Sequence, residues 1–247
     1  MRRFLWWGGL GLLFWGGWVC LSWSHPTYAS ERSLWPAEVA ARGLLQDPAS
    51  SPPVLFKETL NRLQRVIQHY PTSASAARAQ LLIGQIHHAR GDFKKARQEL
   101  AKVIELYPTM PHHVIDAYKT IALTYDEEGN WNRVLGTYRT LLAAYPLDVR
   151  VLSVPIRMVE LSRRYAPESA EAVFEEAVEA YRRVLKEGKP GRLHLMTRQM
   201  LATCLLRSGR WEEAAGEFET LAKNYPTRRE VPIWIKTAEK IRREKLR

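Results

Sequence analysis

Cysteine is nearly absent from this chain of 247 residues: of its two cysteines, only Cys204 lies beyond residue 29. A disulfide within residues 30–247 is therefore excluded, and the fold must be stabilised by buried apolar surface. A chain with roughly 200 residues available can bury enough of it. Cys204 falls between Ala202 and Leu205 of an expected helix, so we expect a buried, unreactive thiol.

The sequence also lacks recognisable catalytic chemistry. It shows no nucleophile elbow, no phosphate-cradling glycine loop and no pattern of a pocketed acid–base pair. The pairs His87-His88 and His112-His113 are adjacent, and adjacent residues on a helix point about 100° apart, so they share no ligand face. We expect His87 to be a packed ring and the second pair to lie at the surface. We predict that the protein is not an enzyme and that it binds no metal ion, no cofactor and no small-molecule substrate.

What the chain does contain is a repeat. A tyrosine–proline pair recurs at a period of roughly 40 residues, with one position skipped. The four pairs are Tyr70-Pro71, Tyr107-Pro108, Tyr145-Pro146 and Tyr225-Pro226. The last three follow, at a constant spacing, a glycine that opens a turn: Gly91, Gly129 and Gly209. Such a period indicates a stack of helical hairpins rather than one globular core.

Each copy has the same internal pattern. Before the glycine, a large and a small residue share one helix face: Ile83-Gly84, Ile121-Ala122 and Leu201-Ala202. The small residue lets a second helix approach closely. After the glycine, an aromatic residue begins the second helix: Phe93, Trp131 and Trp211. The proline then ends it, because proline cannot continue a helix.

These residues resemble the tetratricopeptide repeat over residues 54–226. The resemblance implies an all-α fold: a right-handed superhelical solenoid of tetratricopeptide-like helical hairpins with a C-terminal capping helix. The segment Tyr70–Gln80 is similar to exported bacterial members of the family, such as the outer-membrane assembly lipoproteins and the Tol–Pal-associated envelope proteins.

The pattern predicts four regions. Residues 1–29 are a signal peptide or membrane anchor, 30–53 an irregular linker, 54–226 the repeats and 227–247 a basic capping helix. The repeats are 54–71 (a half repeat whose partner helix would be an irregular stretch at 34–46), 77–108, 115–146, 149–190 and 195–226. The unit 149–190 is irregular, because it lacks the turn glycine and Pro155 falls inside its expected first helix.

The N-terminus predicts export. Phe4–Trp23 carries no charged side chain and follows Arg2-Arg3. Its length favours a retained membrane anchor, whereas its glycines and the small residues near Ala29 favour a cleaved signal. Both alternatives place the repeats in the bacterial periplasm, tethered to the inner membrane by residues 4–23 or soluble after cleavage near Ala29.

Positive charge is concentrated at the C-terminus of a chain whose net charge is +11. A stripe at helical spacing predicts a capping helix; its members are Val231, Trp234, Ala238 and Ile241. The cations Arg242, Arg243, Lys245 and Arg247 would form a basic surface, either solvated or bound to anionic lipid or cell-wall polymer. Nucleic acid is not an expected partner, because no nucleic-acid motif is present.

In the tetratricopeptide family, the first helices of successive hairpins line a groove that accepts a peptide or helix. The resemblance places nine residues on that side: Arg78, Gln85, His88, Lys119, Leu123, Asp126, Gln199, Thr203 and Leu206. The leading hypothesis is an adaptor that binds a segment of another envelope protein during assembly of a complex. Alternatives are an envelope-surface binder acting through the basic C-terminal helix, an accessory or catalytic subunit of an enzyme whose active site a second protein would bring, and a solvated face without a dedicated ligand.

Overall fold

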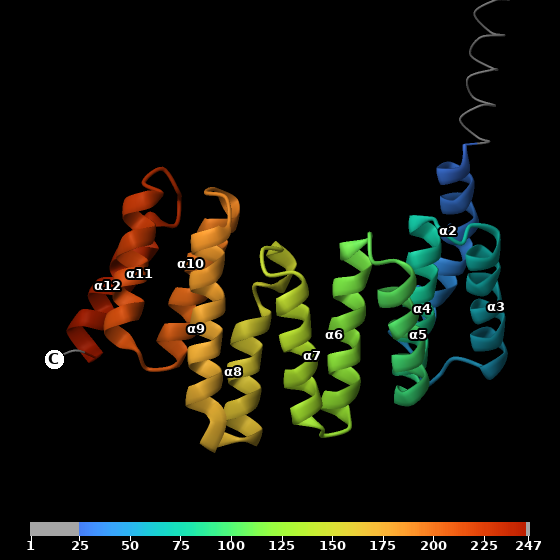
Figure 1. Cartoon of the computed structure of the whole chain (residues 1–247), viewed down its shortest axis with the longest axis horizontal. Helices are drawn as coiled ribbons and strands as arrows, with labels where there is room; N and C mark the ends of the chain where they lie inside the picture. The colour runs from blue at the N-terminus through green and yellow to red at the C-terminus, as the bar shows by residue number, and fades with distance from the viewer. Residues whose placement is uncertain (1–24, 246–247) are drawn as a thin grey trace, which may run out of the picture. The chain divides into compact units, whose positions relative to one another are not determined.

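The protein is an all-helical array of stacked hairpins. The structure, a computed structural model, describes residues 25–245, which fold into eleven α-helices and two short 3₁₀ turns (Figure 1). This confirms the expected fold class, while the handedness of a superhelix stays a prediction. The chain divides into an N-terminal unit, Met1–Thr124, and a C-terminal unit, Tyr125–Arg247.

The N-terminal unit is built from α2 (Pro26–Gln46), α3 (Pro53–His69), α4 (Ala74–Ala89), α5 (Phe93–Leu106) and most of α6 (Pro111–Glu127). α3 and α5 end where the tyrosine–proline pairs begin, and the backbone N–H groups of Tyr70 and Tyr107 close the last turns of these helices. The proline that follows each tyrosine cannot extend the helix. The expected helix ends are therefore confirmed here.

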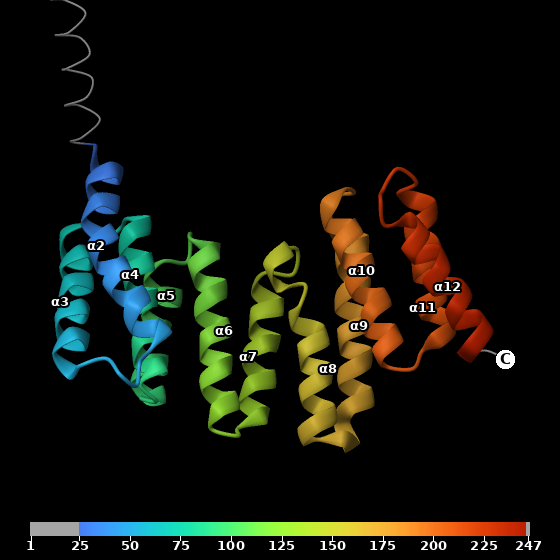
Figure 2. The ribbon, with the colours of Figure 1, turned by 180° about the vertical axis from the view of Figure 1, so that it is seen from behind.

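Helix α2 corrects the expectation that residues 30–53 are irregular. It is continuous from Pro26 to Gln46, with Pro36 inside it, and it packs beside both α3 and α4 (Figure 2). Pro36 removes one backbone hydrogen bond, but the helix persists because one whole face of it is buried. Ser30 is also buried, and its hydroxyl lies 3.0 Å from that of Ser75 on α4.

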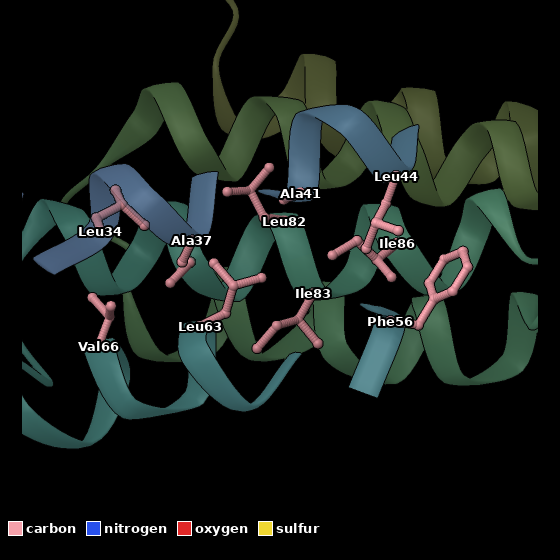
Figure 3. Packing of buried hydrophobic residues seen from close by; sticks show 11 residues of the cluster. Leu34, Ala37, Ala41, Leu44, Phe56, Leu63, Val66, Leu82, Ile83 and Ile86 are labelled. Atoms are coloured by element: carbon pink, nitrogen blue, oxygen red, sulfur yellow. The ribbon is translucent and has the colours of Figure 1, made fainter. Parts of the chain in front are cut away.

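The core of the N-terminal unit is an apolar cluster at the junction of α2, α3 and α4. Figure 3 shows these side chains pointing toward one another between the three helices. The buried members are Leu34, Ala37, Ala41, Leu44, Phe56, Leu63, Val66, Ala79, Leu82, Ile83 and Ile86. α2 is therefore the missing first helix of the expected half repeat 54–71.

The turn between the two helices of a hairpin depends on glycine. Gly91, Gly129 and Gly209 have φ of 75°, 70° and 75°, a left-handed conformation that only glycine adopts without strain. The small residue of the pattern is also explained: a Cβ added at Gly84 would lie 2.5 Å from Cγ of Leu100. α4 and α5 thus approach each other as closely as the sequence predicts.

The C-terminal unit continues the array with the end of α6, α7 (Trp131–Ala144), α8 (Val154–Tyr165), α9 (Ala170–Glu187), α10 (Arg192–Arg207), α11 (Trp211–Asn224) and α12 (Val231–Lys245). The 3₁₀ turns Val149–Val151 and Pro167–Ser169 precede α8 and α9. α12 buries Trp234, Ala238 and Ile241 and packs on α11, as expected of the capping helix.

The unit 149–190 is a hairpin whose helices α8 and α9 are joined by the 3₁₀ turn Pro167–Ser169 instead of a turn glycine. α8 begins at Val154, so Pro155 lies in its first turn and not inside the helix as expected. A proline is tolerated there because N–H groups of the first turn have no partner within the helix. The hydroxyl of Tyr181 on α9 donates a hydrogen bond of 2.8 Å to the carbonyl of Leu152, which holds the entry to α8 against α9.

Within residues 25–245 no helix has both the length and the apolar character needed to cross a membrane. The uncharged run Phe4–Trp23, on which the signal and anchor predictions depend, lies outside the described residues.

Candidate protein-binding surfaces

The groove residues predicted in the N-terminal unit lie on α4 and α6 and are mostly half-buried. Arg78 donates to Oε1 of Glu38 on α2 through Nη2, at 3.0 Å, and Nε, at 3.3 Å. His88 stacks obliquely on Phe93, with ring centroids 5.9 Å apart. Gln85 and Lys119 are half-buried, and Leu123 is exposed. The ion pair of Arg78 with Glu38 therefore joins α4 to α2, the first helices of two successive hairpins, within the chain itself.

In the C-terminal unit, Asp126 has the same linking role. Its Oδ2 accepts from Nη2 of Arg157 on α8 at 3.2 Å. One hairpin later, Arg207 on α10 bonds to Glu160 on α8. Asp126 is thus part of a set of ion pairs that join successive first helices, which the sequence pattern did not reveal.

Two further groove residues, Gln199 and Thr203, lie one turn apart on α10. The hydroxyl of Thr203 donates a hydrogen bond of 2.8 Å to the backbone carbonyl of Gln199. Both side chains are half-buried. The ninth predicted residue, Leu206, differs from the others because it lines a cleft.

The cleft of about 450 Å³ is formed by the ends of α10 and α11 and by one side of α12. Its apolar lining comes from Leu206, Trp211, Ile233 and Ile241. Ile233 is 64% exposed, so an apolar side chain from another molecule could contact it directly. We call this cleft, with the lysines described next, the C-terminal cleft.

Positive charge surrounds the C-terminal cleft. Lys236, Lys240 and Lys245 line it together with one acidic residue, Glu244. The ammonium group of Lys245 lies 5.3 Å from the centre of the Trp211 ring, within the range of a cation–π interaction. An apolar floor with a cationic rim favours a segment that carries both apolar and acidic side chains.

The predicted basic surface is partly neutralised. Arg242 donates to Glu212 at 2.8 Å and to Glu219 at 2.8 and 3.2 Å, and Arg243 lies 3.6 Å from Glu244. The hydrogen bonds from Arg242 hold the pKa of Glu219 below its usual range. Of the four predicted cations, Lys245 lines the cleft and Arg247 lies outside the described residues.

The histidines do not form a metal site in the described part of the chain. His87 is buried, as expected, and burial lowers its pKa. His112 is exposed and His113 half-buried. Between residues 25 and 245, no group of three or more His, Cys, Asp or Glu is arranged to hold a metal ion.

The buried titratable groups are structural. Burial raises the pKa of Cys204 to about 11, so its thiol stays protonated at neutral pH. Burial likewise raises the pKa of Tyr181, whose hydroxyl already donates to Leu152. Neither group has the lowered pKa that a nucleophile needs.

A second cavity, of about 260 Å³, lies between α7 and α9 and was not predicted. Its apolar wall includes Leu142, Val151 and Pro155, and the ion pair of Arg139 with Glu176 lies at its edge. It lies beside the segment from Pro146 to Pro155 that leads from α7 into α8.

Comparisons with known proteins agree on the repeat. The profile described as "Tetratricopeptide repeat" matches residues 56–111 and 170–229. No curated protein matched the chain. The kinesin light chain TPR-like repeats of Podosopora anserina have 18% identity and a TM-score of 0.47, covering 83% of this chain and 99% of that one. A tetratricopeptide repeat protein from Parabacteroides merdae has 14% identity and a TM-score of 0.45, covering 85% and 73%. Pseudomonas aeruginosa pilF has 13% identity and a TM-score of 0.38, covering 83% and 98%.

Proposed function

This chain is a tetratricopeptide-repeat protein, and we propose that it is a scaffold that binds a peptide or helix of another protein in the bacterial envelope. Proteins with these repeats are typically non-catalytic scaffolds that bind protein partners. The observation that carries the proposal for this chain is the C-terminal cleft, which combines an apolar floor with exposed lysines.

The chemistry of the cleft defines the partner. Its volume is in the range of sites that enclose several apolar side chains. The floor residues Leu206 and Ile233 take apolar groups, and Lys236 and Lys240 attract carboxylates. An amphipathic helix or extended peptide with acidic residues beside its apolar anchors supplies both.

The predicted groove contributes through Leu206. Arg78 and Asp126 bond to Glu38 and Arg157 within the chain, so reversing either charge would disturb helix contacts as well as capture. Reversing the charges of Lys119 and Asp126 tests the groove hypothesis. Because this change also affects helix contacts, the stability of the variant has to be measured beside its capture of a partner.

Binding to anionic lipid or cell-wall polymer through the basic C-terminal helix is the second candidate. It has less support, because Arg242 is already bonded to Glu212 and Glu219. The observation in its favour is the group of lysines on α12, which would hold a polyanion without needing the apolar floor.

The envelope location is a proposal based on the sequence of residues 1–29. The uncharged run Phe4–Trp23 is long enough to span a membrane. Retained or cleaved, it predicts that the repeats act outside the cytoplasm, where an accessory role in assembly of a multiprotein complex suits a scaffold.

Capture from an envelope extract tests the proposed function. Tagged full-length protein would be compared with Ile233→Glu, in the cleft, and Leu106→Glu, on α5; these apolar side chains are 64% and 63% exposed. We expect Ile233→Glu to lose at least one captured protein and Leu106→Glu to keep it, with both variants folded by circular dichroism. Equal capture by all three proteins would remove the cleft from the proposal.

The charge of the rim is tested separately. Lys236→Glu with Lys240→Glu should weaken capture, and Lys57→Glu on α3 serves as a control for a lost surface lysine. If the double variant instead loses binding to anionic vesicles while protein capture is unchanged, the second candidate is favoured.

A further inference from the structure

Helix α2 has one buried face and, opposite it, an exposed face that is also rich in apolar residues. At 100° per residue, Ser30, Leu34, Ala37, Ala41 and Leu44 share one side, and all of them are buried. The opposite side carries Tyr28, Arg32, Trp35, Val39 and Arg42, all exposed. We call these last five residues the outer face of α2.

The outer face is more apolar than solvation requires. Trp35 is 68% exposed, Val39 48% and Tyr28 45%. The solvent side of a helix normally carries polar and charged residues, and clustered exposed apolar residues mark an interaction surface. α2 contacts α3 and α4 through its buried side, so these helices do not explain the aromatic residues on the other one.

The position of this face in the chain limits what can cover it. Tyr28 follows Trp23, the last residue of the uncharged run, by five residues. A chain of five residues reaches at most about 17 Å. If the run lies in a bilayer, Tyr28 is held near the lipid headgroups whatever the path between them. Trp35, seven residues further along the same helix side, lies about 10 Å beyond Tyr28.

The chemistry of the face fits a membrane surface. Trp and Tyr are enriched at the membrane–water interface, since each combines an apolar ring with a polar group. Arginine side chains beside them can reach anionic headgroups while their stems stay in apolar contact. The acidic residue near them, Glu38, accepts from Arg78 at 3.0 Å and lies 3.8 Å from Arg42, while Glu31 lies at the edge of the face.

We infer that the outer face of α2 rests on an anionic lipid bilayer and holds the N-terminal hairpin against the membrane. This rests on the retained-anchor alternative of the proposed function, in which residues 4–23 stay in the membrane, and it is independent of the C-terminal cleft. The face would fix the orientation of the protein at the membrane, with α2 lying along the membrane surface.

The test compares two positions of equal exposure in the N-terminal unit. Val39, in the outer face, and Leu55, on α3, are 48% and 47% exposed. Each is replaced by cysteine in the full chain carrying Cys20→Ser, spin-labelled, and reconstituted in vesicles of phosphatidylglycerol and phosphatidylcholine. Buried Cys204 stays unlabelled. Collision with oxygen, which concentrates in lipid, is measured against collision with a water-soluble nickel complex.

The expected result is preferential oxygen access at position 39 and preferential nickel access at position 55. Replacing Arg32 and Arg42 by glutamine should reduce the ratio of lipid-contacting to detached molecules about fivefold for each arginine removed. Vesicles of phosphatidylcholine alone should have a similar effect.

Two results would overturn the inference in distinguishable ways. If the chain floats with vesicles but position 39 behaves like position 55, the attachment stands and the contact of α2 fails. If the chain does not float, both the attachment and the contact fail. Neither result bears on capture by the C-terminal cleft, which is measured with separate variants.

Discussion

The two units differ in the contacts that dominate between successive helices. In the N-terminal unit, α2, α3 and α4 meet in the apolar cluster around Leu63 and Ile86, and the ion pair Arg78–Glu38 joins α2 to α4. In the C-terminal unit, arginine–carboxylate pairs run between hairpins from α6 to α12, in addition to buried apolar residues. These pairs include Arg139–Glu176, Arg182–Glu213, Arg210–Glu175 and Arg242–Glu219.

The two units thus stabilise the same repeat by contacts that respond differently to salt. Apolar contacts between helices are not screened by salt, whereas exposed ion pairs contribute about 0–1 kcal/mol each and are screened by it. The unit that carries the C-terminal cleft is therefore the one whose helix contacts respond most to ionic conditions.

Removing part of the apolar cluster should have the largest effect. Leu63→Ala deletes a fully buried side chain and should lower the free energy of unfolding of the N-terminal unit by about 2–5 kcal/mol, because a cavity remains. Val54→Ala, at an exposed position on the same helix, should change it by less than about 0.5 kcal/mol. Urea unfolding followed by hydrogen exchange would locate the loss; equal losses for both variants would contradict the assignment of the core.

Two glycines should respond to alanine with opposite signs. Gly84→Ala places a Cβ 2.5 Å from Leu100 and should destabilise the N-terminal unit by about 1–3 kcal/mol through overpacking. Gly136→Ala on α7 meets no atom within 4 Å and should stabilise the C-terminal unit by about 0.5–1 kcal/mol, since alanine favours helix. Thermal unfolding of the two variants would show it, and a gain for Gly84→Ala would exclude the close approach of α4 and α5.

The ion pairs should have small effects that salt removes. A double-mutant cycle on Arg139 and Glu176, which form a two-pronged contact at 2.8–3.1 Å, should give a coupling energy of about 0.2–1 kcal/mol in dilute buffer. In 1 M salt the Debye length is about 3 Å, so the coupling should vanish. A coupling unchanged by salt would show that the pair acts through packing instead.

Acid should weaken the contact between α11 and α12 selectively. Arg242 holds the pKa of Glu219 below its usual range, so this contribution to stability is fully present above the unfolded pKa of about 4.3. It is lost as the pH falls through the lower pKa of the folded state. Protection of α12 amides from hydrogen exchange should fall below about pH 4.5 in the native chain; Glu219→Gln should lack this step, and an identical profile would refute the linkage.

Local sequence signals predicted the regular hairpins well. Gly91, Gly129 and Gly209 adopt the positive φ that only glycine favours, and Tyr–Pro pairs end α3, α5, α7 and α11. Such signals act within a few residues, so they can be read without knowing what the chain packs against. Of helix α2, only an irregular stretch at 34–46 was expected, and burial against α3 and α4 explains why the helix is regular and continues through Pro36.

The candidate site could be predicted only in part. Leu206 was placed on the groove side, but Ile233, Lys236 and Lys240 were not chosen, although they recur on α12 at helical spacing. Their meaning depends on the packing of α12 beside α10 and α11, which no local pattern specifies. Arg78 and Asp126 were predicted to contact a binding partner. Their ion-pair partners within the chain lie on other helices, 31 or more residues away in sequence, so no local pattern reveals these pairs.

The most direct measurement is photo-crosslinking in living cells, with a photoreactive amino acid placed at Ile233 or at Leu106 of the full-length protein. We predict that Ile233 gives a crosslink to one or two envelope proteins, through a segment with apolar and acidic residues, and that Leu106 does not. The same crosslinks from both positions, or none to protein from Ile233, would contradict the claim that the C-terminal cleft binds a protein segment.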